Sequence, residues 1–141
     1  MTPKRNREDA TTLIQVGSGS FPKDERLLKG HEFRYMRENG ESFVGKYVVM
    51  SYAKAEDGKR KVGIVVSKRF NKRAVVRNRA KRIIRESYRM IKTLHEGYWF
   101  VFIARHRLQK VDAIELQQEI IRLMQQAKVI TDDQVSQLNL R

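Results

Sequence analysis

The sequence predicts a single α+β domain in which three helices pack against one small sheet. Its 141 residues suffice for one modest hydrophobic core. Three segments are rich in β-branched and aromatic residues, as strands are, and three others repeat their apolar residues at helical spacing. Read in chain order, these elements give αββαβα, the pattern of a small α+β sandwich.

The first half of the chain predicts one helix followed by two strands. The helix spans about 31–38, and the Asn39-Gly40 pair ends it. Residues 46–53 are rich in Val, Tyr and Met and predict a strand. A turn at 56–58 separates them from a second strand, 61–67, which places valine and isoleucine on one face. We expect these two strands to pair as a hairpin.

The second half predicts a long helix, a central strand and a last helix. Residues 76–94 place their apolar side chains in one arc of about 120° around a helix. Residues 98–105 are apolar on both faces, which is typical of a central strand. The last helix runs from about 112 to 127, and Asp112 is placed to cap its N-terminus.

We expect this single domain to occupy residues 23–130. A flexible basic and polar arm over residues 1–22 would precede it, because that stretch shows no sustained period, and a polar tail over 131–141 would follow. The chain has no cysteine, no apolar run near the roughly 18 residues of a membrane span, and no apolar core of a signal peptide. These observations predict a cytoplasmic protein without disulfides or a membrane segment.

Positive charge is concentrated in one stretch of the chain. Of the 25 residues from Lys68 to Lys92, eleven are Lys or Arg and one, Glu86, is acidic, so this stretch carries a net +10 of the total +14. The remaining surface is nearly balanced, and the charge therefore indicates a binding face. A nucleic acid fits such a face well, because each neutralised phosphate also releases condensed counterions.

Within the basic helix, one stripe of polar side chains faces away from the apolar arc. Asn78, Arg82, Arg85 and Arg89 are spaced 4, 3 and 4 and would form a line about 16 Å long. Arg82 with Glu86 is the only pair of opposite charges four residues apart. A solvated helix face normally carries more acidic partners than this, so the pattern favours contact with an RNA or DNA backbone.

Three motifs in this region resemble a known family. Gly63-Ile-Val-Val-Ser-Lys-Arg69, Ala74-Val-Val-Arg-Asn-Arg79 and Lys81-Arg-Ile-Ile-Arg-Glu86 are similar, in order and spacing, to the signature of the protein subunit of bacterial ribonuclease P. A looser resemblance extends over residues 26–130. It implies a fold like domain 2 of ribosomal protein S5, with a left-handed βαβ crossover. Without the resemblance we would expect a right-handed one.

The resemblance also implies a function. The chain would be a non-catalytic subunit of an endoribonuclease, binding ribonuclease P RNA and the 5′ leader of precursor tRNA, while the RNA subunit with Mg²⁺ removes the leader. The protein alone would bind no cofactor or metal, and no obligate protein partner is evident. The expected RNA-binding residues are the polar side chains of the basic stretch: Lys68, Arg69, Lys72, Arg73, Arg77, Asn78, Arg79, Lys81, Arg82, Arg85 and Arg89.

A second surface is expected around the first helix. Aromatic residues flanked by basic ones lie on or near this helix and the first strand, and from them we expect Phe33, Arg37 and Tyr47 to line a cleft. The family holds the leader in a cleft between this helix and the sheet, which favours Phe33 above the others. Arg37 stands where many members have a second aromatic residue. Aromatic side chains there would stack on single-stranded nucleotides, although most aromatic residues of a small sheet fill its core.

No catalytic constellation is recognisable in the sequence. His31, His95 and His106 are scattered, with no carboxylate at ligand spacing, and we interpret each as an ordinary surface residue. Two other functions remain open: a general RNA-binding or ribosome-associated structural protein, and a DNA-binding regulator. The regulator is less favoured, because no helix-turn-helix pair precedes the basic helix.

Overall fold

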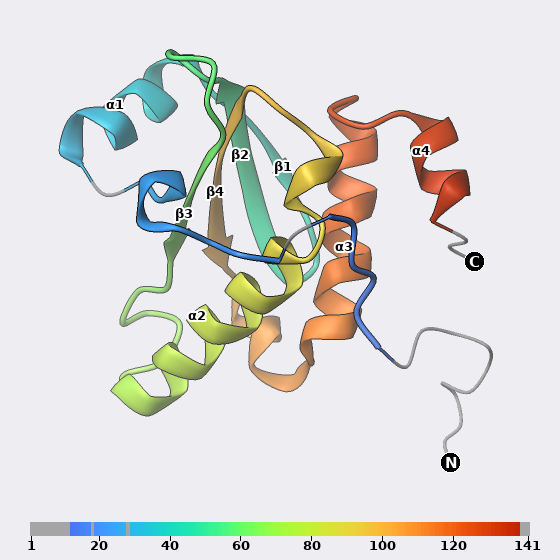
Figure 1. Cartoon of the computed structure of the whole chain (residues 1–141). Helices are drawn as coiled ribbons and strands as arrows, with labels where there is room; N and C mark the ends of the chain where they lie inside the picture. The colour runs from blue at the N-terminus through green and yellow to red at the C-terminus, as the bar shows by residue number, and fades with distance from the viewer. Residues whose placement is uncertain (1–11, 18, 28, 139–141) are drawn as a thin grey trace.

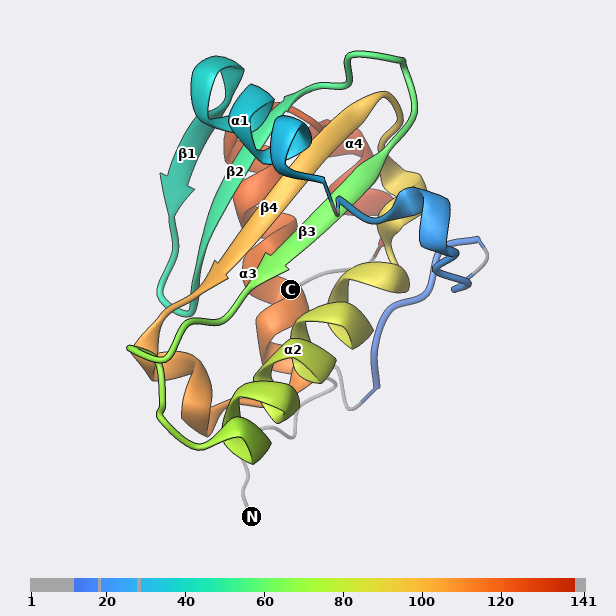
Figure 2. The ribbon, with the colours of Figure 1, turned by 90° about the vertical axis from the view of Figure 1, so that its left-hand side faces the viewer.

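The computed structural model describes residues 12–17, 19–27 and 29–138, and confirms the α+β class (Figure 1). Helix α1 lies on one face of a four-stranded sheet, and α2 and α3 lie on the other (Figures 1 and 2). In chain order the elements are η2 (Lys23–Glu25), α1 (Gly30–Asn39), β1 (Glu41–Val44), β2 (Val48–Lys54), β3 (Lys61–Val65), α2 (Ala74–Arg89), η3 (Lys92–Leu94), β4 (Tyr98–Ala104), η4 (His106–Lys110), α3 (Ala113–Gln126) and α4 (Asp132–Gln137).

The strand order β1-β2-β4-β3 corrects one prediction. β4 is central, as its apolar faces indicate, and it pairs antiparallel with β2 and parallel with β3. The expected hairpin between the strands at 46–53 and 61–67 is therefore wrong, because β4 lies between them. The partner of β2 in a hairpin is instead β1, which the sequence did not reveal because its four residues are largely exposed at the sheet edge.

The connection β3–α2–β4 is the parallel βαβ unit that the resemblance implies. Figure 2 looks onto the face that carries α1 and shows β3 and β4 pointing to the lower left, with β4 on the upper left of β3. The buried side chains of α2 pack against the opposite face of the sheet. The crossover from β3 to β4 is therefore left-handed, the rare hand for such units.

Each face of the sheet has its own hydrophobic cluster, because successive strand residues point to opposite sides. The larger cluster joins β2 and β4 to α2 and α3, with Phe100, Phe102 and Ile84 fully buried. The smaller cluster lies under α1 and includes Met36 and Trp99. Helix α1 thus packs on one face of the sheet, and α2 and α3 pack on the other.

The segments on either side of the predicted domain also make contacts. Residues 1–11 and 18 of the expected arm lie outside the described residues, but Ile14 exchanges two 2.8 Å hydrogen bonds between its backbone and the buried Gln117 side chain of α3. In the C-terminal tail, Thr131 caps α4, and Val135 and Leu138 pack against the larger cluster. No helix of the described chain has the length and apolarity needed to cross a membrane.

Candidate nucleic-acid interface

Helix α2 divides into a buried and a cationic side, as the sequence predicts. Ala80, Ile83, Ile84 and Tyr88 are buried against the larger cluster. On the opposite side Asn78, Arg82 and Arg85 are exposed, as are further basic side chains on and before the helix: Lys68, Arg69, Lys72, Arg73 and Arg79. Lys81 is half-buried at the border. The structure therefore brings the predicted stripe to the surface with its side chains turned away from the core.

Arg77 differs from its basic neighbours because it organises the loop before α2. Its guanidinium donates to the carbonyls of Asn71 and Lys72, at 3.0 and 2.8 Å. The Asn71 side chain in turn accepts from the backbone N–H of Arg73 at 2.9 Å. These bonds fix the direction in which the chain enters the helix, and so the orientation of the exposed residues around it.

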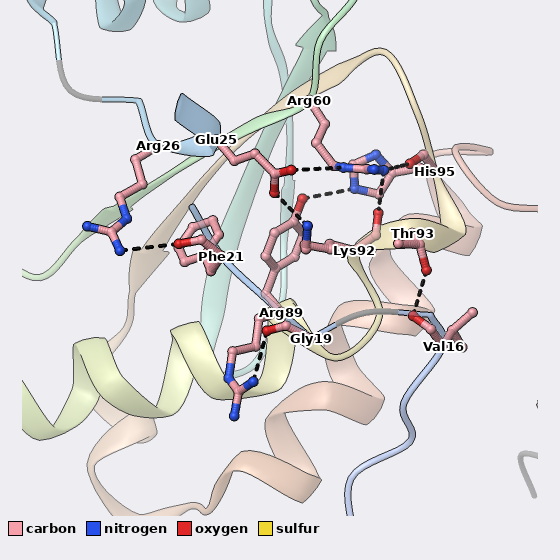
Figure 3. A network of polar contacts seen from close by, with 11 residues as sticks. Val16, Gly19, Phe21, Glu25, Arg26, Arg60, Arg89, Lys92, Thr93 and His95 are labelled. Atoms are coloured by element: carbon pink, nitrogen blue, oxygen red, sulfur yellow. Dashed lines mark hydrogen bonds and ion pairs between the residues drawn. The ribbon is translucent and has the colours of Figure 1, made fainter. Parts of the chain in front are cut away.

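Arg89, the last member of the predicted stripe, is also engaged within the protein. Its Nε and one NH₂ group donate to the Glu86 carboxylate, both at 3.0 Å. Its other NH₂ group donates to the Gly19 carbonyl at 2.9 Å (Figure 3). The sequence predicted Arg82 as the partner of Glu86, but the i,i+3 pair with Arg89 forms instead. Arg82 and Arg85 are consequently the exposed arginines of the stripe.

A buried network lies beside Arg89 and corrects the interpretation of one histidine. His95 is buried, not on the surface, and its Nε2 shares a 3.0 Å hydrogen bond with the Tyr88 hydroxyl. Arg60 donates to the His95 carbonyl at 2.7 Å, and the buried Lys92 ammonium meets Glu25 at 2.7 Å (Figure 3). Burial, with the nearby Arg60 and Lys92 charges, lowers the pKa of His95 to about 3. The ring is therefore neutral, and its role is structural.

The three expected leader-contacting residues do not share one surface. Phe33 and Arg37 are one turn apart on α1, with Arg37 exposed and Phe33 half-buried above Gly63 of β3. A Cβ atom at Gly63 would lie 3.1 Å from the Phe33 ring, so glycine there lets the ring approach the strand. Beyond α1, Ile103 of β4 lies on the same sheet face and is itself 38% exposed.

Tyr47 lies on the opposite side of the sheet from Phe33. It packs in the larger cluster, and its hydroxyl donates to a carboxylate oxygen of Glu115 on α3 at 2.5 Å. The pKa of Tyr47 is raised to about 12. The largest cause is this hydrogen bond, and burial and the charges of Glu115 and Glu119 add to it. The buried Glu119 carboxylate accepts from the backbone N–H groups of residues 46, 47 and 48 at 2.7 to 3.1 Å. The turn that carries Tyr47 is thereby held on α3.

A second basic segment, which was not predicted, lies at the C-terminal end of β4. Residues 105–110 contain Arg105, Arg107 and Lys110 and no acidic residue, which is the signal that would have revealed them. All three are exposed, as is Lys46 across from them. Within the described residues, no group of three or more His, Cys, Asp or Glu side chains could hold a metal ion.

The fold and its exposed arginines define a small α+β protein with a cationic helix face suited to a polyanion. The family model described as Ribonuclease P matches residues 21–128. The ribonuclease P protein component of Clostridium botulinum strain 657 is 35% identical over 109 residues, which cover 76% of this chain and 97% of that protein. A relative of the same description from Caldanaerobacter subterraneus is 35% identical over 100 residues, or 70% of this chain and 85% of that one.

Solved structures agree with the sequence relatives. The RNase P protein of Staphylococcus aureus matches with a TM-score of 0.67 and 26% identity, covering 76% of this chain and 98% of that one. The RNase P protein of Thermotoga maritima matches with a TM-score of 0.64 and 29% identity, covering 72% and 96%. The chain belongs to the ribonuclease P protein family. Membership implies a part in tRNA 5′ processing together with an RNA subunit.

Proposed function

We propose that this protein binds the RNA subunit of ribonuclease P and the 5′ leader of precursor tRNA, and so promotes endonucleolytic removal of the leader. The observation that carries the proposal is the exposed stripe of Asn78, Arg82 and Arg85 on α2. Arg89 neutralises the one acidic residue of this helix, Glu86. Arg82 and Arg85 therefore keep their positive charge, which suits them to the phosphates of the RNA subunit.

The leader would lie on the other side of the sheet. Phe33 offers a partly exposed ring, Arg37 offers a charge one turn away, and Ile103 extends an apolar surface beyond α1. A single-stranded leader needs this combination, because bases stack on rings and phosphates pair with cations regardless of sequence. Tyr47 is not part of this surface, because it lies on the opposite side of the sheet.

The hydrolytic chemistry would belong to the RNA subunit and its Mg²⁺ ions. The described residues offer no metal-binding cluster, and the buried His95 is held neutral by its surroundings. The protein would contribute binding: it neutralises charge where two polyanions meet, so that fewer free cations are needed to hold substrate and ribozyme together. We place this activity in the cytoplasm, where precursor tRNA is made.

Affinity purification from the source cells, followed by RNA sequencing, tests the proposal. The tagged protein should enrich ribonuclease P RNA and precursor tRNAs that still carry leaders. A matched variant, Arg82→Glu with Arg85→Glu, should lose this enrichment while it keeps its fold, because both side chains point away from the core. Enrichment of ribosomal RNA instead would favour the ribosome-associated alternative, and enrichment of DNA would favour a regulator.

A further inference from the structure

A pocket with a cationic rim lies at the end of the sheet where β4 meets η4. Its volume is about 480 Å³, and Lys46, Tyr47, Arg107, Lys110, Val111 and Glu115 contribute to its lining. This volume is within the range of pockets that hold small organic groups. Lys46, Arg107 and Lys110 are exposed at the rim, whereas Tyr47 and Val111 are buried and form an apolar floor.

The pocket is structurally joined to the basic stretch before α2. The Gln109 side chain of η4 donates to the Phe70 carbonyl at 2.8 Å and accepts from the Asn71 side chain at 3.2 Å. These bonds place η4 against the loop that carries Lys68, Arg69, Lys72 and Arg73. The cationic surface of α2 therefore continues around the end of the sheet and reaches the pocket.

The lining combines three kinds of group that a nucleotide needs. The Tyr47 ring is aromatic and has the Lys46 ammonium 5.6 Å from its centroid. The Glu115 carboxylate already accepts a hydrogen bond from the Tyr47 hydroxyl, and a carboxylate has further lone pairs for a base amino group. Arg107 and Lys110 offer positive charge to phosphates on either side of a base. A duplex hides its bases from such a pocket, so the nucleotide must be unpaired.

We propose that this pocket receives one unpaired nucleotide of the RNA subunit, with the base over Tyr47 and Val111 and the flanking phosphates beside Arg107 and Lys110. The proposal rests on the proposed function, since it assumes that α2 binds that RNA. The leader is a poorer occupant, because Phe33 lies on the opposite face of the sheet and the pocket is continuous with the α2 side.

Site-directed crosslinking tests the pocket directly. The natural chain has no cysteine, so each introduced one is a unique attachment point for a photoreactive group. The attachment point is placed at the pocket in Arg107→Cys, on the stripe in Arg82→Cys, and near the opposite end of β4 in Lys59→Cys. Each variant is assembled with the RNA subunit and precursor tRNA and irradiated, and the crosslinked nucleotides are mapped by primer extension. We expect Arg107→Cys to label an unpaired nucleotide of the RNA subunit, Arg82→Cys to label the same RNA elsewhere, and Lys59→Cys to leave that unpaired nucleotide unlabelled.

The outcomes separate the inference from the proposed function. If Arg82→Cys labels the RNA subunit while Arg107→Cys labels nothing or only the leader, the pocket assignment is wrong and the proposed function stands. If neither variant labels the RNA subunit, both are wrong. As a second readout, Arg107→Gln with Lys110→Gln should reduce the slope of log affinity against log salt by about 1.4, the value for two lost contacts to single-stranded RNA. An unchanged slope in the folded variant would also refute the pocket.

Discussion

The contrast between Arg85 and Arg89 gives a sharp prediction, because the two side chains are one turn apart on α2 and differ in their partners. Arg85 is exposed, and within the described residues it makes no ion pair or hydrogen bond through its side chain. Arg89 binds the Glu86 carboxylate and the Gly19 carbonyl. We therefore expect Arg85→Gln to weaken RNA binding with little effect on stability. Arg89→Gln should instead lower stability with little effect on RNA binding.

The contacts set the size of each effect. Losing one phosphate contact through Arg85→Gln should reduce the salt slope by about 0.7 to 0.9, depending on whether the bound RNA is single-stranded or duplex. Arg89→Gln removes an i,i+3 ion pair worth about 0.2 to 0.5 kcal/mol and a charged hydrogen bond to the Gly19 carbonyl, which partial exposure weakens. The combined loss should be about 1 kcal/mol, which lowers Tm by about 3 to 5 °C for a domain of this size.

Two assays on the same pair of variants check these values. Binding of the RNA subunit is measured at several monovalent salt concentrations, and thermal unfolding is followed by circular dichroism. Arg85→Lys serves as a control that keeps the charge and should keep the slope. If Arg89→Gln reduces the slope as much as Arg85→Gln does while Tm stays at the wild-type value, the assigned difference between the two arginines is wrong.

Three further predictions concern other parts of the molecule. Phe33→Ala should weaken binding of precursor tRNA by about 1 to 3 kcal/mol and leave the affinity for mature tRNA unchanged. Equal losses of affinity for both tRNAs would show that Phe33 is a core residue and does not contact the leader. Glu119→Gln should destabilise the fold by about 2 to 4 kcal/mol in urea denaturation, because a neutral amide cannot accept from three backbone N–H groups equally well; an unchanged midpoint would contradict this. The folded-state pKa of His95, about 3, lies below its unfolded value of about 6.5, so the unfolded chain takes up a proton between these values. Stability should thus fall by about 2 kcal/mol from about pH 8 to about pH 5, and His95→Gln should reduce that fall.

The fold was predictable where periodicity alone decides the element. Helices α2 and α3 and the central strand β4 each have an unambiguous apolar pattern, and all three are confirmed, although α2 ends at Arg89 and does not continue to Leu94 as the pattern predicted. Strand pairing was not predictable in the same way. The turn at 56–58 is chemically suited to a hairpin, but β4 is apolar on both faces and gains more burial between β2 and β3 than at an edge.

The candidate site was also predictable only in part. The basic residues of α2 follow from spacing, but sequence alone could not show that Arg77 and Arg89 bind backbone carbonyls, because their acceptors lie in irregular segments. Tyr47 looked like a neighbour of Phe33 because both are aromatic residues near the first strands. Glu119 of α3, which is distant in sequence, holds the Tyr47 turn on the other side of the sheet.

Cleavage of precursor tRNA at low Mg²⁺ tests most directly whether the protein supplies binding and its RNA partner supplies the chemistry. The rate is measured with purified protein alone, with ribonuclease P RNA alone, and with both, as Mg²⁺ is lowered and monovalent salt is raised. We expect no cleavage by the protein alone, restoration of cleavage at low Mg²⁺ by the two together, and a benefit that salt erodes because it depends on phosphate neutralisation. RNA-free cleavage that follows the protein through purification and is lost on mutation of one carboxylate or histidine would show instead that the protein itself is a nuclease.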